Sequence, residues 1–298
     1  MPRPRRDLAM TGRVKPLGMA AGLAVLKAAC QLRPMWRRLL LLLAVMGLAL
    51  AIIGYRNAQA DPLLRRATVS LPNWPQGAPP LRVLLLSDVH AARPDMPLSR
   101  VARIVEIANA QNADAILIAG DIVSERWLQQ KVPTKDVMTT LGRLRAPLGV
   151  YAVYGNHDHW RGQAEVRRQL RVAGITALRD EAVRVGPITL GGIDDSTTDH
   201  SDFEGTLTKM RREGPRPMVM LSHGFDYFKF MPPDLPLLLA GHSHCGQITL
   251  PWGLGPKVPC GVVRGKGKQM IVTSGLGTSL VPMRFNAPPD MWVVTLGR

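Results

Sequence analysis

Residues 81–90 read LRVLLLSDVH, an apolar run that ends at Leu86 and is followed by the polar cluster Ser87 to His90. Four later apolar runs end in the same way, in short clusters that contain His, Asp or Asn. These runs cover residues 115–119, 150–154, 218–221 and 235–240. Short apolar runs are typical of strands that are buried on both faces. The sequence therefore predicts five buried strands, each followed by side chains that can bind a metal.

Helical patterns separate these runs. Residues 99–111 and 164–173 carry apolar side chains at helical spacing, and residues 186–192, 270–272 and 291–296 resemble further strands. Alternating strands and helices indicate a layered α/β domain. In such domains ligands gather at the carboxyl ends of the strands. Because all five polar clusters follow strands, one site could collect them.

Seven side chains in these clusters offer the oxygen and nitrogen atoms that divalent metals prefer. A lone His at a strand end usually has a structural role, but five such clusters rarely occur together by chance. One shared carboxylate can bridge two ions about 3.5 to 4 Å apart, and such a pair can hold a phosphate ester and activate a water. Glycines before three of the clusters allow sharp turns and close approach of the backbone to a ligand. The candidate ligands are Asp88, His90, Asp121, Asn156, His223, His242 and His244.

The order of the motifs, D-x-H, G-D, G-N-H-D, H and G-H-x-H, resembles the signature of the calcineurin-like metallophosphoesterase family. The resemblance covers about residues 81–298. It implies an α/β fold of four layers, a sandwich in which two mixed β-sheets are flanked by helices and the site lies at the sheet ends. It also implies two divalent metal ions as cofactors, and manganese, iron and zinc all fit these ligands.

The resemblance implies a role for each motif residue. The ligands implied for the first metal are Asp88, His90 and His244. Those implied for the second metal are Asn156, His223 and His242. Asp121 resembles the carboxylate that bridges the two ions. His157 resembles the catalytic histidine, which stabilises charge on the phosphate or protonates the leaving oxygen. Asp158 is then expected to orient His157.

Two further stretches resemble a narrower group. The element Gly241 to Gln247 (GHSHCGQ) and the tail from Val272 to Arg284 resemble a membrane-associated or exported bacterial branch. That branch contains UDP-2,3-diacylglucosamine hydrolase-like members and general phosphodiesterases. Two positions depart from its pattern, since Phe225 stands where many members carry Pro and Cys245 where many carry Gly. Neither change removes a candidate ligand, so we expect a reshaped pocket around an intact site.

The formal net charge of +16 is concentrated near the N-terminus. Residues 1–66 hold 12 Lys or Arg and two acidic residues, which gives a net +10. Residues 39–55, 17 in number, carry no charge and reach the lower length limit of a transmembrane helix. Basic residues lie mainly before this run, so the positive-inside rule places the N-terminus in the cytoplasm. We predict a basic cytoplasmic segment (1–38), a membrane anchor (39–55), a Pro-rich linker (56–80) and a catalytic domain (81–298).

This topology places the catalytic domain on the periplasmic or outer side of a bacterial inner membrane. Ala58-Gln59-Ala60 also matches a signal-peptidase site, so export after cleavage near Ala60 stays open as an alternative. The three cysteines form no CxxC pattern. A single bridge between Cys245 and Cys260 could form in an oxidising compartment.

The sequence predicts an enzyme, a metal-dependent phosphoesterase that hydrolyses phosphomonoester, phosphodiester or pyrophosphate bonds with an activated water. The alternative is a membrane-anchored module that binds polyanions or lipids and uses its metals structurally. All seven ligands and His157 are present, which favours the enzyme. An anchor near the domain makes a lipid-linked phosphate a convenient substrate, whereas export would separate the domain from cytoplasmic nucleotide-lipids. We expect no nucleic-acid partner, and the sequence leaves the substrate, the metals and the oligomeric state open.

Overall fold

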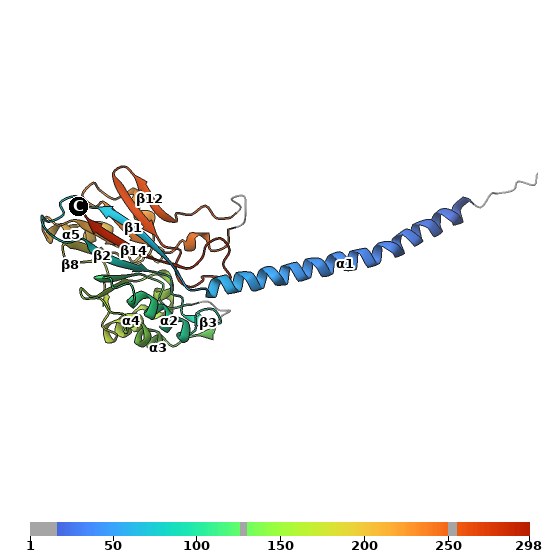
Figure 1. Ribbon diagram of the computed structural model, residues 1–298, viewed down its shortest axis with the longest axis horizontal. Coiled ribbons are helices and arrows are strands. Elements are labelled where there is room, and N and C mark those ends of the chain that lie inside the picture. Colours follow the sequence, from blue (N-terminus) through green and yellow to red (C-terminus); the bar gives the residue numbers. More distant parts are fainter. Residues whose placement is uncertain (1–16, 126–129, 250–254) are drawn as a thin grey trace, which may run out of the picture. The chain divides into compact units, whose positions relative to one another are not determined.

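A computed structural model describes residues 17–125, 130–249 and 255–298. Helix α1 (Leu17–Gln59) contains the predicted apolar run. Among the described residues, its segment Met35–Gln59 is the one helical stretch that is long and apolar enough to cross a membrane. Residues 1–16 of the predicted cytoplasmic segment lie outside the described residues. The chain divides into two units, Met1–Ala51 and Ile52–Arg298, and the second unit carries all the strands (Figure 1).

Two six-stranded sheets form the centre of the second unit. The first contains β1 (Leu63–Ser70), β14 (Asp290–Gly297), β2 (Leu81–Leu86), β4 (Ala115–Ala119), β6 (Val150–Val153) and β7 (Thr176–Ala177), in that order. The second contains β12 (Gly261–Gly265), β13 (Lys268–Val272), β11 (Leu237–Ala240), β10 (Met218–Leu221), β9 (Ile188–Gly192) and β8 (Glu181–Val185). Both sheets are mixed: β14 is antiparallel to β2, and β12 and β8 are antiparallel to their neighbours. A small separate pair joins β3 (Ala92–Arg93) to β5 (Gln130–Lys131).

Alternate side chains of the central strands enter two different cores. In β2, Leu84 and Leu86 pack in the core that includes helices α2 (Leu98–Asn109), α3 (Thr134–Leu141) and α4 (Asn156–Val172). Val83 and Leu85 pack in the core between the two sheets. Period-2 alternation explains this division, because successive strand side chains point to opposite faces.

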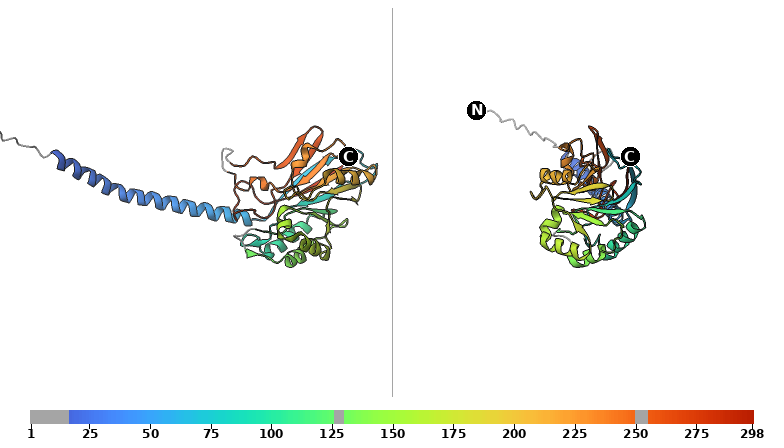
Figure 2. Two further views of the ribbon diagram at one scale, coloured as in Figure 1. Left: turned by 180° about the vertical axis from the view of Figure 1, so that it is seen from behind. Right: turned by 90° about the vertical axis from the view of Figure 1, so that its left-hand side faces the viewer.

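Helix α5 (Phe203–Arg212) covers the outer face of the second sheet, where Leu207 and Met210 pack. In both views of Figure 2 the green helices of residues 98–172 lie on one side of the sheets. The layers therefore run helices, sheet, sheet, helix, which confirms the predicted α/β sandwich of two mixed sheets flanked by helices. Short 3-10 turns, η1 (Asp226–Lys229) and η2 (His244–Gly246), complete the unit.

Residues 56–80 differ from the linker that the sequence predicted. Helix α1 continues to Gln59, and β1 pairs with β14 along its whole length, from Leu63 to Ser70. Pro62 and Pro72 flank this strand and do not interrupt it, which an edge strand tolerates. The strand was missed because most of its side chains are exposed or half-buried, so its sequence lacks an apolar run.

Candidate metal centre

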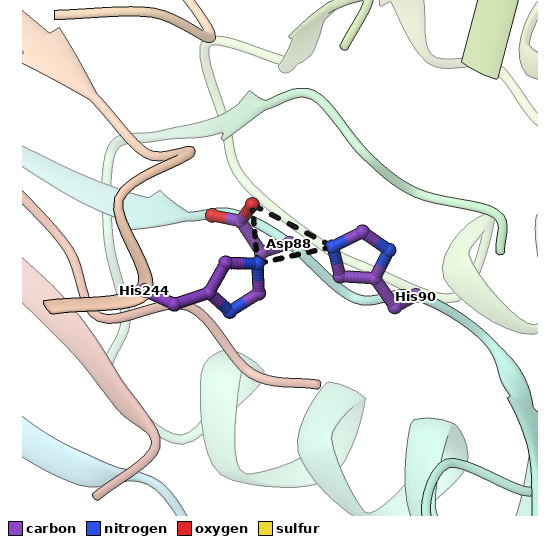
Figure 3. A group of neighbouring side chains, drawn as sticks. All are labelled: Asp88, His90 and His244. Carbon is purple, nitrogen blue, oxygen red and sulfur yellow. Dashed lines mark hydrogen bonds and ion pairs between the residues drawn. The ribbon is translucent and has the colours of Figure 1, made fainter. Parts of the chain in front are cut away.

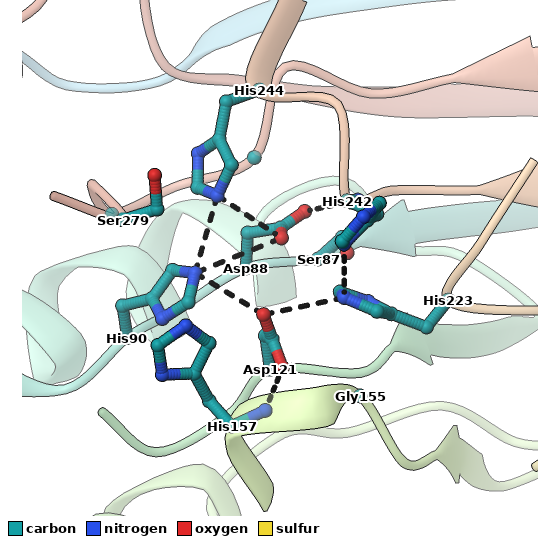
Figure 4. A network of polar contacts seen from close by, with 12 residues as sticks. Ser87, Asp88, His90, Asp121, Gly155, His157, His223, His242, His244 and Ser279 are labelled. Carbon is teal, nitrogen blue, oxygen red and sulfur yellow. Dashed lines mark hydrogen bonds and ion pairs between the residues drawn. The ribbon is translucent and has the colours of Figure 1, made fainter. Parts of the chain in front are cut away.

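The five polar clusters follow strands, and those strands come from both sheets. Strands β2, β4 and β6 of the first sheet precede Asp88, Asp121 and Asn156. Strands β10 and β11 of the second sheet precede His223 and the pair His242 and His244. The carboxyl ends of these strands converge, so side chains from both sheets meet in one network (Figure 4). The structure therefore brings together all seven ligands that the sequence predicted.

Asp88, His90 and His244 form the first group (Figure 3). Asp88 Oδ1 lies 3.3 Å from His244 Nε2 and 3.8 Å from His90 Nε2. The two imidazole Nε2 atoms are 3.2 Å apart. All three side chains are buried. Three potential ligand atoms thus lie close enough together to hold one ion.

Asp121, His223 and His242 form the second group, and Asn156 adjoins it. His223 Nε2 lies 3.2 Å from Asp121 Oδ2, 3.2 Å from Asn156 Oδ1 and 3.0 Å from His242 Nδ1. The same Asp121 Oδ2 lies 3.4 Å from His90 Nε2 of the first group. Asp121 therefore stands between the two groups.

A buried atom of the first group supports a cation at this place. Asp88 Oδ1 is buried and has no hydrogen bond to any described residue. Its nearest neighbours are the imidazole nitrogens of His90 and His244. A buried carboxylate oxygen without a donor is costly, and a bound divalent ion would satisfy it. The carboxylate and imidazole atoms present thus fit the metals that the family resemblance implies.

The backbone at the site adopts conformations that L-residues avoid. Five of the candidate ligands have φ between 46° and 65°, and they are Asp88, His90, Asp121, His242 and His244. Such left-handed conformations cluster at functional sites, where they aim side chains. Two of the predicted glycines permit the close approach. A Cβ atom on Gly155 would lie 2.2 Å from Asp121 Oδ1, and one on Gly241 would lie 2.6 Å from Asp88 Oδ2.

Asp121 and His223 stabilise each other's charged forms within the buried site. Burial opposes ionisation of Asp121, but His223 and His90 hold its pKa below its usual range. Burial also opposes the charged form of His223, yet Asp121 raises the pKa of that imidazole to about 10. Burial lowers the pKa of His90 and His244 well below the usual value, so their nitrogens offer lone pairs. A cation bound at the second group would therefore displace a proton.

His157 lies against both the first group and Asp121. Its ring meets that of His90 edge-on, with centroids 4.7 Å apart, and its backbone N–H donates to Asp121 Oδ1 at 2.8 Å. The ring Nδ1 accepts a hydrogen bond from the backbone N–H of Glu125 at 3.3 Å. A neutral His157 in this contact carries its proton on Nε2. Unlike most of the ligands, His157 is only partly buried.

Asp158 joins two of the site's loops. Its Oδ1 accepts from the backbone N–H groups of Ile122 and Val123 at 3.0 and 3.1 Å, and its Oδ2 accepts from Gly155 at 3.1 Å. Burial, followed by the neighbouring charge of Asp121, raises the pKa of Asp158 to about 7. Asp158 thus fixes the start of α4, which carries His157, through the backbone.

The comparisons with known proteins agree with this geometry. The sequence pattern of the family described as calcineurin-like phosphoesterase matches residues 81–246. The chain belongs to this family. The phosphoesterase is 29% identical over 260 residues to an uncharacterized metallophosphoesterase of Helicobacter pylori, covering 82% of this chain and 68% of the relative. It is 30% identical over 270 residues to a zebrafish (Danio rerio) transmembrane protein with metallophosphoesterase domain, covering 83% of this chain and 60% of that protein. Membership makes the phosphoesterase a metal-dependent hydrolase.

A third relative is the uncharacterized metallophosphoesterase YkuE of Bacillus subtilis, 30% identical over 237 residues, with coverage of 74% of this chain and 81% of the relative. The phosphoesterase spans 60% of the length of the zebrafish relative.

The site has one feature that the sequence did not predict and one that it left open. Arg284 is fully buried beside His244, with its Nη2 atom 3.2 Å from His244 Nδ1, although its sequence context gave it no role. Cys245 forms a disulfide with Cys260, the bridge that the sequence left open. The bridge means that Cys245 offers no thiolate to a metal. Cys245 also has a φ of 51°, a left-handed conformation that glycine adopts more readily than other residues.

Proposed function

We propose that the phosphoesterase hydrolyses phosphate esters with two divalent ions, held by the seven candidate ligands. The observation that carries this proposal is the place of Asp121 Oδ2, 3.4 Å from His90 Nε2 and 3.2 Å from His223 Nε2. A carboxylate oxygen between two ligand groups is what a bridging ligand requires. When bound, two such ions would lower the pKa of a bridging water and stabilise in-line displacement at phosphorus. Manganese, iron and zinc all accept these ligands.

The partly exposed residues of the site indicate where the ester approaches. His157 and His242 are partly exposed, whereas the other ligands are buried. With its proton on Nε2, His157 can donate to a phosphoryl oxygen or to the leaving oxygen. Asp158 and the backbone bond to Asp121 hold the start of α4, so they set the position of His157. We also propose that the chain belongs to the branch with UDP-2,3-diacylglucosamine hydrolase-like members. The resemblance of the GHSHCGQ element and of the tail to Arg284 supports this assignment.

The function is tested on the purified full-length chain with bis(4-nitrophenyl) phosphate. We expect release of nitrophenol that requires added Mn²⁺, stops with a chelator and returns with fresh metal. Two ions per chain should be bound, as measured by elemental analysis. The alternative, a module that binds polyanions or lipids, predicts bound metals without turnover of phosphomonoesters, phosphodiesters or pyrophosphates. That outcome would replace the enzyme with the binding module.

We further propose that α1 is a retained anchor and that the catalytic unit lies outside the cytoplasm, on the periplasmic side of an inner membrane. The charge asymmetry around residues 39–55 supports this topology. The bridge between Cys245 and Cys260 supports an oxidising compartment. Cleavage near Ala60 would remove Gly54 and Ala58, which are buried in the second unit.

Fusions to an enzyme that is active only in the periplasm should give active reporters when placed after residue 66. Fusions to a reporter that requires the cytoplasm should be inactive at the same position. The opposite pattern would reverse the topology. The mass of the mature protein decides between retention and cleavage, because loss of residues 1–60 would change it measurably.

A groove beside the metal groups supports an amphiphilic, lipid-linked phosphate as the substrate. It has a volume of about 300 Å³ and is lined by His242 and His244 together with the apolar side chains Ile248, Pro256, Val258, Leu280 and Val281. Ile248 pairs with Phe285, and the Phe285 ring lies against Gly54 near the end of the apolar run. Ile248, one of the residues that line the groove, is therefore connected through Phe285 to the end of the proposed anchor. A hydrocarbon chain emerging from the membrane could follow these contacts.

Alkyl 4-nitrophenyl phosphates that share one leaving group test the groove. We expect kcat/KM to rise at least about tenfold from the methyl to the octyl ester, since a buried CH₂ contributes about 0.8 kcal/mol. Leu280→Asp should remove this rise and spare the methyl ester, because Leu280 is 77% exposed. Val172→Asp is the matched control, at a site on α4 that is 75% exposed. Equal rates along the series would contradict the lipid-linked substrate.

A further inference from the structure

We infer that Arg284 is a positioning residue that connects the ligands of the first group to the end of helix α1. The inference rests on the metal-binding part of the proposed function and is independent of hydrolysis. Arg284 is fully buried, and among the residues whose burial is described it is the largest fully buried side chain. A buried guanidinium must find partners for its five N–H groups, so its neighbours show what it holds in place.

The guanidinium binds one loop several times. Its Nε donates to Gly277 O at 3.0 Å, its Nη1 to Ser274 Oγ at 3.0 Å, and its Nη2 to Ser274 O at 2.8 Å. A further bond joins Nη1 to Ala287 O at 2.8 Å. The planar fork thus fixes residues 274–277, a task that the single ammonium of Lys cannot reproduce.

That loop in turn packs against two ligands of the first group. The N–H groups of Leu276 and Gly277 donate to Ser87 O at 3.0 Å and to Asp88 O at 2.7 Å. A Cβ atom on Gly275 would lie 2.5 Å from Asp88 Cβ, and one on Gly277 would lie 3.0 Å from His90 Cβ. Any movement of the loop therefore moves Asp88 and His90.

The third ligand of the group touches Arg284 directly. Arg284 Nη2 lies 3.2 Å from Nδ1 of His244, on the ring edge opposite to the Nε2 that faces Asp88. When Nε2 binds a metal, Nδ1 carries the proton and cannot accept from Arg284, so this contact restricts the His244 ring by packing and not as a hydrogen bond. Arg284 thus reaches all three ligands of the first group, whereas none of its side-chain hydrogen bonds to the described residues goes to a ligand of the second group.

The backbone of Arg284 is held by helix α1. Its N–H donates to Gly54 O at 2.9 Å, and its carbonyl accepts from Asn57 Nδ2 at 3.2 Å. A Cβ atom on Gly54 would lie 2.5 Å from the Phe285 ring, so this close approach requires glycine. The apolar run ends at Tyr55, so the end of the anchor and the first group share one residue as support. A shift of Gly54 and Asn57 at the end of α1 would thereby change the affinity of the first group for its metal.

The test is a Mn²⁺ titration of the full-length chain in lipid nanodiscs, which resolves the affinities of the two ions. His90→Ala and His242→Ala variants assign each affinity to a group. We expect Arg284→Lys and Arg284→Leu to weaken the first-group affinity about 10- to 100-fold, the usual effect of a residue that supports a ligand. The second affinity should change less than about threefold. Hydrogen exchange of residues 274–277 in the metal-free protein should become faster.

Asn57→Ala and Gly54→Leu should also weaken the affinity of the first group for Mn²⁺, but by less than the Arg284 variants do. Asn109→Ala is the matched control, since Asn109 also donates to a backbone carbonyl, that of Arg143 at 2.9 Å, far along the chain from the metal ligands. Arg211→Leu, which removes a surface ion pair with Asp234, controls for the loss of an arginine. If Arg284→Leu does not fold, Arg284→Lys and Asn57→Ala carry the test.

If the Arg284 variants weaken the binding of both ions equally, Arg284 is a general structural element and the inference is overturned. Unchanged affinity in both Asn57→Ala and Gly54→Leu would overturn the coupling to α1. A wild-type chain that binds two ions but hydrolyses no ester would contradict the proposed function alone. A wild-type chain that binds no metal would contradict both.

Discussion

The His157→Ala variant is expected to lose about 10²- to 10⁴-fold in kcat on an ester with a poor leaving group, because general acid assistance is worth that much. Its metal content should stay close to wild type. The contact that ties this residue to Asp121 is made by the backbone N–H, at 2.8 Å, and alanine keeps it. The measurement is steady-state turnover with elemental analysis of the same sample.

A second substrate identifies what the imidazole does. A nitrophenyl ester has a good leaving group and needs little protonation, so an acid role predicts a smaller loss on that ester. A role in stabilising charge on the phosphoryl oxygens predicts a similar loss on both. The structure also brings His157 within reach of His90 and Asp121 as a potential ligand group. A fall in metal content together with activity would favour that ligand role over catalysis, and full activity with metal bound would refute the catalytic role.

The Asp121→Asn variant is expected to lose metal and activity together. Its Oδ2 serves both groups, at 3.4 Å from His90 and 3.2 Å from His223, and its charge raises the pKa of His223 to about 10 against the effect of burial. An amide keeps the shape but removes the charge that attracts both ions. Loss of a supporting residue already costs about 10- to 100-fold in metal affinity, so the loss of the bridge should exceed about 100-fold.

Asp114→Asn is the control for this variant. Asp114 directly precedes β4, at the opposite end from Asp121, and accepts from the backbone N–H of Arg82 at 2.7 Å. It should lose little activity and no metal. The measurement is Mn²⁺ binding by titration, with kcat/KM for the same preparation. Two ions bound to Asp121→Asn at wild-type affinity would exclude Asp121 as a bridge.

Much of the fold was readable because the central strands are buried on both faces. Burial on both faces produces uninterrupted apolar runs, and the runs Leu81 to Leu86 and Ala115 to Ala119 are strands in the structure with the same bounds. Strand β1 shows where this reasoning fails. Its residues Leu63 to Ser70 are mostly exposed or half-buried, so their pairing with β14, 227 positions later in the chain, leaves no local apolar signal.

The sequence by itself determined which residues could bind metal, because each polar cluster directly follows an apolar run and strand ends in α/β domains face one edge. Only the tertiary structure decided how they combine. Asp121 lies between two ligand groups, Cys245 pairs with Cys260, and Arg284 lies against His244. These relations depend on the distances between segments far apart in the chain. Packing of the two sheets sets those distances, whereas local periodicity reports only which face of an element is buried.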